Sequence, residues 1–247
     1  MDFIKFYNNN YILYILYIIM KPCITCGNKP IKNGIYKAHL EHFAEKQLPK
    51  DNKPYHAKDA SIQKIKLSGL KPNQTIFYFG AGERDFTKSI QPRLVAYGKL
   101  NNSGVARINK DGIAITYLHC PQLYVNYDGK IYSRHMHFLY WDELHKTWNK
   151  NLYTQQVLCK IDKDANTKKV YVVDARPEEM YEKKHLEGAV SMPYNKKWTE
   201  EKVLDILNIT KDDKLIPILI YSGKDKDLAN QLYNKLNKLG FYNTMFI

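Results

Sequence analysis

Four side chains near the N-terminus have the types and the spacing of a zinc site. Cys23 and Cys26 are two residues apart, and His39 and His42 follow on a segment, 38–47, that we expect to be helical. Zinc takes four nitrogen or sulfur ligands in a tetrahedron, and histidines three apart lie on one face of a helix. We predict a structural zinc ion that folds a segment too short to hold itself together. The alternative is a pair of reduced cysteines beside surface histidines.

A second group of candidate metal ligands comprises Tyr124, His135 and His137. Residues two apart on a β-strand point to the same face, so the two histidines can bind one metal ion. In outline, the tyrosine after a proline turn and the H-x-H pair are similar to intradiol ring-cleaving dioxygenases, in which such residues bind ferric iron. The resemblance implies a second tyrosine ligand, at Tyr97 or Tyr117. The alternative is a strand with two solvent-side or hydrogen-bonded histidines.

The last third of the chain carries a series of short motifs in a fixed order. They are Asp174-Ala175-Arg176, His185-Leu186-Glu187-Gly188-Ala189 and Met192-Pro193, followed by an apolar strand ending at Tyr221, a loop and a helix. This series resembles a rhodanese domain over residues 155–247. The resemblance implies a parallel sheet covered by helices, with Asp174, Arg176 and His185 serving local structure. It also implies a sulfurtransferase whose loop cysteine carries a persulfide.

The loop after Tyr221 has a serine where the family places that cysteine. It reads Ser222-Gly223-Lys224-Asp225-Lys226-Asp227, with Asp227 where an arginine commonly closes the loop. Sulfur transfer needs a thiolate that can hold sulfur as a persulfide, and a serine hydroxyl cannot store sulfur. We therefore predict a degenerate loop without a catalytic residue, and we expect Asp227 to oppose anions there. Cys159, just ahead of the domain, is the other thiol that could take the role, although a buried structural cysteine is the commoner outcome.

The elements that must position these residues change type along the chain. Short segments rich in β-branched and aromatic residues, separated by glycine-containing turns, predict antiparallel strands. They span 75–79, 104–108, 112–118, 123–126 and 130–140. From residue 170 onwards strands and helices alternate, which is typical of a parallel sheet, and the last strand, 243–247, is followed by no further helix.

The sequence therefore predicts a multidomain protein. We expect a zinc module with a connector over 20–60, a β-sandwich over 61–154 and the α/β rhodanese-like domain over 155–247. Residues 1–19 precede these domains. The apolar run that ends at Met20 is too short to span a bilayer and has no cleavage signal. We read them as an interfacial anchor or as a leader, translated from an AT-rich genome, ahead of a start at Met20.

The charge and cysteine content limit the kinds of partner and the cellular location that the chain suits. The chain has 247 residues and a net charge of +13, but of its 38 basic residues only five are arginine, the residue that reads bases best. This lysine bias is typical of an AT-rich genome and predicts no specific nucleic-acid binding. The four cysteines do not form a disulfide framework for a chain of this size, which favours a reducing, cytoplasmic location.

These observations predict a rhodanese-domain protein without sulfurtransferase activity, in which the domain binds a protein partner or a small anion. Two enzyme readings stay open beside it. One is a sulfurtransferase that uses another thiol, and the other is a metal-dependent oxygenase in the middle part of the chain.

Overall fold

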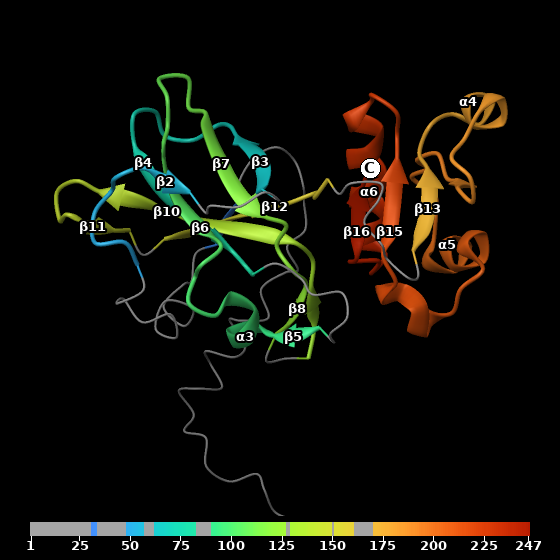
Figure 1. The fold of residues 1–247 in the computed structure, drawn as a ribbon, viewed down its shortest axis with the longest axis horizontal. Helices are drawn as coiled ribbons and strands as arrows, with labels where there is room; N and C mark the ends of the chain where they lie inside the picture. The colour runs from blue at the N-terminus through green and yellow to red at the C-terminus, as the bar shows by residue number, and fades with distance from the viewer. Residues whose placement is uncertain are drawn as a thin grey trace, which may run out of the picture.

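The structure is a computed structural model that describes residues 31–33, 48–56, 62–82, 90–126, 129–149, 151–160 and 170–247. A β-rich middle unit, drawn from blue to yellow, lies beside a C-terminal α/β unit, drawn in orange and red (Figure 1). The predicted zinc ligands Cys23, Cys26, His39 and His42 lie outside the described residues, as does the segment 1–19.

The middle unit is built from three sheets. The largest has seven strands in the order β1 (Ile31–Asn33), β12 (Leu152–Gln156), β10 (His135–Asp142), β4 (Thr75–Gly80), β6 (Ser103–Arg107) and β2 (Tyr55–His56), with β11 (Thr147–Trp148) paired to β10. A two-stranded sheet comprises β3 (Ile62–Leu67) and β7 (Ala114–His119), and a three-stranded sheet comprises β5 (Gln91–Pro92), β8 (Tyr124–Val125) and β9 (Ile131–Tyr132). All pairs in the largest sheet are antiparallel, as the sequence predicts. Over the described residues the predicted sandwich is therefore a sheet-rich unit with more than two sheets.

Strand β10 separates two hydrophobic layers because its side chains alternate between the faces of the sheet. Met136 and Phe138 pack on one side with the β3–β7 pair, in a cluster that includes Leu67 and Leu118. Leu139 packs on the opposite side with aromatic residues of β4 and of α3 (Arg93–Tyr97). His135 and His137 share this second side, because each is an even number of residues from Leu139.

The C-terminal unit contains a four-stranded parallel sheet. Its order is β14 (Val190–Ser191), β13 (Tyr171–Asp174), β15 (Ile218–Tyr221) and β16 (Thr244–Phe246). The helices are α4 (Glu178–Lys183), α5 (Glu200–Leu207), the short 3-10 helix η2 (Lys211–Leu215) and α6 (Lys226–Lys238). Strands and helices alternate here as predicted from residue 170 onwards, and β16 lies inside the predicted last strand, 243–247, whereas η2 is an additional element.

The two faces of this parallel sheet have different coverings. Val173 and Ile220 belong to a core that includes side chains of α5 and α6, such as Val203 and Leu232. Alternate residues of the strands point to the opposite face. There Leu219 of β15 and Met245 of β16 join the hydrophobic cluster of the middle unit. The expectation that helices cover the sheet thus holds for one face, and the middle unit covers the other.

Covalent and hydrogen bonds reinforce this junction. Cys120, after β7, forms a disulfide with Cys159, which leads into the C-terminal unit. The backbone N–H of Phe246 donates to the carbonyl of Cys159 at 3.0 Å, and the Tyr233 hydroxyl of α6 donates to the carbonyl of Val157 at 3.2 Å. The cysteine count predicted no disulfide framework, and the described residues contain this single disulfide, which forms because the fold brings together two residues separated by 39 positions.

The described helices are all short. Among the described ranges, none is long and apolar enough to cross a membrane.

Candidate functional sites

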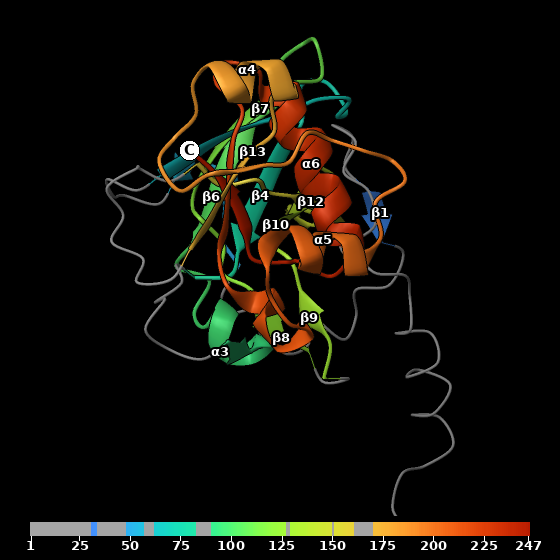
Figure 2. The ribbon, with the colours of Figure 1, turned by 90° about the vertical axis from the view of Figure 1, so that its right-hand side faces the viewer.

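Four polar side-chain atoms converge at one end of the middle unit. Around the Nε2 atom of His135 lie the Tyr124 hydroxyl at 3.1 Å, the Tyr97 hydroxyl at 3.2 Å and the Nε2 atom of His137 at 3.2 Å. The residues come from three elements, because the tyrosines lie on β8 and at the end of α3 and the histidines lie on β10. Figures 1 and 2 both show α3 beside β8 at this end of the unit.

The cluster is enclosed by aromatic side chains. Tyr97, Tyr124, His135 and His137 are each only 3–4% exposed. The Phe79 ring of β4 lies 5.4 Å from the His137 ring, and the two tyrosine rings meet edge to face at 5.3 Å. This packing fixes the position of each ring without supplying further charge.

The contacts of the His135 ring determine which of its nitrogens carries the hydrogen. Nδ1 lies 2.6 Å from the carbonyl of Ser133, and a carbonyl can only accept, so Nδ1 carries the hydrogen. Burial lowers the pKa of His135 to about 4, which keeps the ring neutral. Nε2 therefore has a lone pair directed at the cluster. In His137, Nδ1 lies 2.9 Å from the Thr154 hydroxyl, so its Nε2 atom is also turned inward.

The crowding around Nε2 of His135 fits a bound cation. One lone pair can accept about one good hydrogen bond, whereas three polar atoms lie within 3.2 Å of it. Two ligands bound to one metal at about 2.1 Å are about 3.0 Å apart at a right angle and about 3.4 Å apart at the tetrahedral angle. Two imidazoles and two phenolic oxygens form a donor set for a transition metal, and the bonds from Nδ1 supply the outer-shell support that metal-bound histidines commonly have.

The structure brings together the three residues predicted here and adds a fourth. Of the two candidates for the second tyrosine, Tyr97 lies in the cluster, whereas the Tyr117 ring lies 5.1 Å from His56 on another strand. The described residues contain no group of three or more His, Cys, Asp or Glu side chains that could hold a metal. The candidate centre therefore depends on its tyrosines as ligands.

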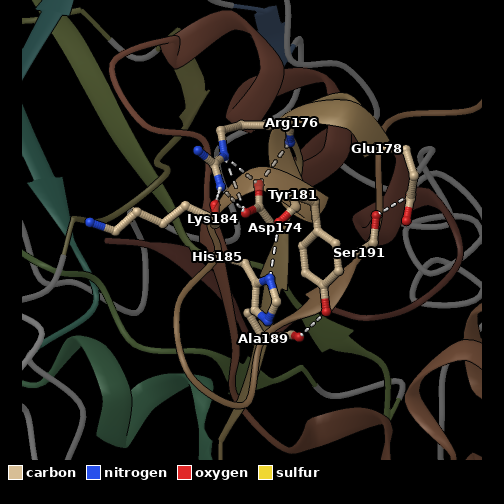
Figure 3. Close-up of polar contacts among 8 residues, drawn as sticks. All are labelled: Asp174, Arg176, Glu178, Tyr181, Lys184, His185, Ala189 and Ser191. Carbon is tan, nitrogen blue, oxygen red and sulfur yellow. Dashed lines mark hydrogen bonds and ion pairs between the residues drawn. The ribbon is translucent and has the colours of Figure 1, made fainter.

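A second candidate site surrounds the end of β13, where the Asp174 carboxylate organises the chain. It accepts hydrogen bonds from the backbone N–H and the guanidinium of Arg176, which in turn donates to the carbonyl of Lys184 at 2.6 Å (Figure 3). Nδ1 of His185 lies 3.0 Å from the carbonyl of Tyr181, and their rings stack at 4.1 Å. These three motif residues thus bond to neighbouring backbone, which fits the local structural role implied for them.

Nearby contacts close the same region. The Tyr181 hydroxyl donates to the carbonyl of Ala189 at 2.8 Å, and the Ser191 hydroxyl donates to the Glu178 carboxylate (Figure 3). Helix α4 is thereby held to the turn that leads into β14.

The loop between β15 and α6 begins with Ser222, which is 6% exposed. Its carbonyl accepts from the backbone N–H of Asp225 at 3.2 Å, and Gly223 adopts a φ of +64°, so the loop forms a tight turn. A hydroxyl in this place can donate or accept hydrogen bonds but cannot carry sulfur.

Asp225 occupies the start of α6. Its carboxylate accepts from the backbone N–H groups of Asp227 at 2.9 Å and of Leu228 at 3.3 Å. These are the groups that would otherwise favour an anion at a helix N-terminus. The sequence predicts that Asp227 opposes anions here, whereas the carboxylate that caps the helix is that of Asp225.

Cys159 does not supply a thiol to this loop. It is completely buried and its sulfur is bonded to that of Cys120. In this oxidised form neither cysteine can attack or carry sulfur.

Comparison with known families agrees with the fold of this part. Residues 156–247 match the family described as the rhodanese-like domain. The C-terminal third of this chain is a rhodanese-like domain. Neither the curated proteins nor the solved structures provide a match. The dioxygenase-like outline of the middle unit thus has no support from these comparisons.

Proposed function

We propose that this protein binds a ferric ion in its middle unit and carries a rhodanese-like domain that does not transfer sulfur. The observation that supports the first part is the convergence of Tyr97, Tyr124 and His137 on Nε2 of His135 within 3.2 Å. Phenolates are hard, anionic ligands that favour a trivalent ion, and imidazoles suit iron. Ferric iron held in this way would supply Lewis-acid and redox chemistry.

The chain's own residues would prepare such a site. The neutral His135 ring presents its lone pair without first losing a proton, while the two phenols lose theirs on binding. Aromatic packing excludes water around the donors, which strengthens their attraction for a cation. A metal-dependent oxygenase is the activity that this donor set favours, in agreement with the resemblance to ring-cleaving dioxygenases.

The proposal for the rhodanese-like domain is supported by Ser222 at the loop start and by the capping of α6. Asp225 places a negative charge where the persulfide of an active enzyme would need N–H donors. A sulfurtransferase that uses Cys159 is disfavoured by the Cys120–Cys159 disulfide. The capped helix also disfavours a small anion as the partner, so a protein surface is the partner that we propose for this domain.

The zinc site at Cys23, Cys26, His39 and His42 is a separate proposal that rests on spacing alone. One zinc per full-length chain, lost in Cys23→Ser, is the expected result, and unchanged zinc in that variant would contradict it.

Elemental analysis with a sulfur-transfer assay tests the proposed function. Full-length protein is exposed to excess ferric ion, passed over a desalting column and analysed for iron, with the double variant His135→Ala/His137→Ala as the control. We expect about one iron per chain in the wild type and much less in the variant, and no thiosulfate-to-cyanide sulfur transfer. Equal iron in both proteins would overturn the metal centre, and measurable sulfur transfer would overturn the inactive loop.

A further inference from the structure

The orientation of the His135 ring depends on one backbone carbonyl. Its Nδ1 atom donates to the oxygen of Ser133 at 2.6 Å. That oxygen belongs to the peptide group that joins Ser133 to Arg134, and a peptide group is planar and moves as a unit. Whatever fixes this peptide group therefore fixes the direction in which Nε2 of His135 points.

Contacts from both units of the protein hold this peptide segment. Within the sheet, the Gln156 side chain donates to the Ser133 hydroxyl at 3.1 Å, and the backbone N–H of Val157 donates to the carbonyl of Arg134 at 3.0 Å. From the rhodanese-like domain, the carboxamide oxygen of Asn243 accepts from the Arg134 guanidinium at 2.7 Å. A second guanidinium nitrogen lies 3.5 Å from the carbonyl of Tyr242.

Asn243 is a rigid acceptor. It is 1% exposed, its side-chain nitrogen donates to the carbonyl of Leu215 at 2.7 Å, and its own carbonyl accepts from the backbone N–H of Ile218 at 2.9 Å. The first bond fixes the carboxamide and the second fixes the Asn243 backbone, both to the segment that enters β15 at the amino end of the parallel sheet. Arg134 is also 1% exposed, and a buried guanidinium requires such hydrogen bonds to offset its lost hydration.

We propose that the rhodanese-like domain positions the metal ligand His135 through the hydrogen bond between Asn243 and Arg134. Arg134 and Asn243 are positioning residues, since neither contributes one of the four converging donor atoms. The expected effect on metal affinity rests on the proposed metal centre. The contacts between Arg134 and Asn243 link the two units whether or not a metal is bound. It gives the rhodanese-like domain a binding role toward the middle unit of its own chain.

Two readouts on the full-length protein test this inference. The first is the ¹⁵N NMR signal of the His135 imidazole in chelator-treated, metal-free protein, which reports the hydrogen on Nδ1. The second is the affinity for ferric ion measured by competition with a chelator. Asn243→Ala removes the acceptor, so we expect an altered imidazole signal and a loss of affinity of up to about 10-fold, since removal of a direct outer-shell partner typically costs that much or more.

A matched control breaks other hydrogen bonds across the same junction. The Gln63 side chain exchanges two hydrogen bonds with the backbone of Lys160, both at 2.9 Å, and has no part in the His135 contacts described above. We expect Gln63→Ala to leave the imidazole signal unchanged and the affinity within about twofold of the wild type. Asn243→Asp keeps an acceptor for Arg134 while it loses the bond to Leu215, so a wild-type imidazole signal in this variant would assign the effect to the contact with Arg134.

The outcomes separate this inference from the proposed function. Wild-type imidazole signal and affinity in Asn243→Ala would overturn the positioning role and leave the metal centre intact. A wild-type protein that takes up no ferric ion would overturn the metal centre, while the imidazole signals would still decide whether Asn243 orients His135. If Asn243→Ala does not fold, Arg134→Lys, which loses the planar fork but keeps the charge, carries the same test.

Discussion

The Nε2 atoms of His135 and His137 lie 3.2 Å apart inside the protein, with both rings turned toward one point. Alternation along β10 places the two side chains on one face, and hydrogen bonds at both Nδ1 atoms set the ring orientations. Two imidazole lone pairs that face each other repel, so the arrangement is stabilised when both nitrogens bind one cation or when the Thr154 hydroxyl donates to His137 and leaves a hydrogen on its Nε2 atom. The first possibility is the basis of the proposed metal centre.

Removal of one phenol should weaken that centre. We expect Tyr124→Phe to lower the affinity for ferric ion at least ~10-fold, because an anionic ligand is lost while the ring remains to pack. Chelator competition measures the effect. Tyr132→Phe is the matched control, because the Tyr132 ring stacks on that of Tyr124 at 5.5 Å but its hydroxyl is not among the four converging atoms. Equal losses in the two variants would argue against Tyr124 as a ligand.

The buried His135 should make the stability of the metal-free protein depend on pH. Burial lowers its pKa to about 4, from 6.5 in the absence of burial. As the pH falls below 6.5 the unfolded state gains the proton first, so the free energy of unfolding should decrease down to about pH 4. The full difference corresponds to about 3 kcal/mol.

Urea unfolding at several pH values, in the presence of a chelator, measures this dependence. His135→Gln has no imidazole at this position, so its stability should decline less over the same interval. Parallel pH profiles for the variant and the wild type would show that His135 does not titrate in this way.

The loop from Ser222 to Asp227 should respond differently to one substitution and to two. Ser222→Cys supplies a thiol, but the Asp225 carboxylate at the start of α6 disfavours a thiolate or persulfide there, so we expect little bound sulfane sulfur. Adding Asp225→Asn keeps a capping oxygen and removes the charge, which should increase the sulfur carried. Cyanide-released thiocyanate measures it after treatment with thiosulfate, and Ser222→Ala serves as the blank. More sulfur in the single variant than in the double variant would contradict the role given to Asp225.

The Cys120–Cys159 disulfide should stabilise the junction between the two units. Reduction, or the double variant Cys120→Ala/Cys159→Ala, should lower the free energy of unfolding by about 3 kcal/mol. Denaturant unfolding with and without a reductant measures this, and the double variant should be insensitive to the reductant. A wild-type protein whose unfolding midpoint does not change on reduction would show that the bond contributes nothing.

The local pattern of the sequence was sufficient to predict most elements of the C-terminal unit, several strands of the middle unit and some residues of each candidate site. Alternation along 130–140 placed His135 and His137 on one face, and the motifs from Asp174 to Met192 indicated the rhodanese-like fold. Strands β3 and β12 and helix α3 lie outside the predicted elements, because each is short and its local pattern is weaker than the contacts that hold it in the fold.

Contacts between distant residues could not be predicted in this way. Cys120 and Cys159 are separated by 39 positions and Arg134 and Asn243 by 109, and nothing in the local pattern specifies such pairs. The choice of Tyr97 over Tyr117 likewise depends on how α3 packs against β8. The capping by Asp225 depends on the turn that precedes α6, which the order of charges alone does not define.

Visible absorption of the ferric-loaded, full-length protein tests the central claim most directly. Tyrosinate bound to ferric iron gives a charge-transfer band that neither free ferric ion nor iron bound by histidine alone produces. We predict such a band in the wild type and a weaker or shifted band in Tyr97→Phe and in Tyr124→Phe. The double variant Tyr97→Phe/Tyr124→Phe should show no band. A ferric-loaded wild-type protein without the band, or a band that persists in the double variant, would contradict a metal centre built from these residues.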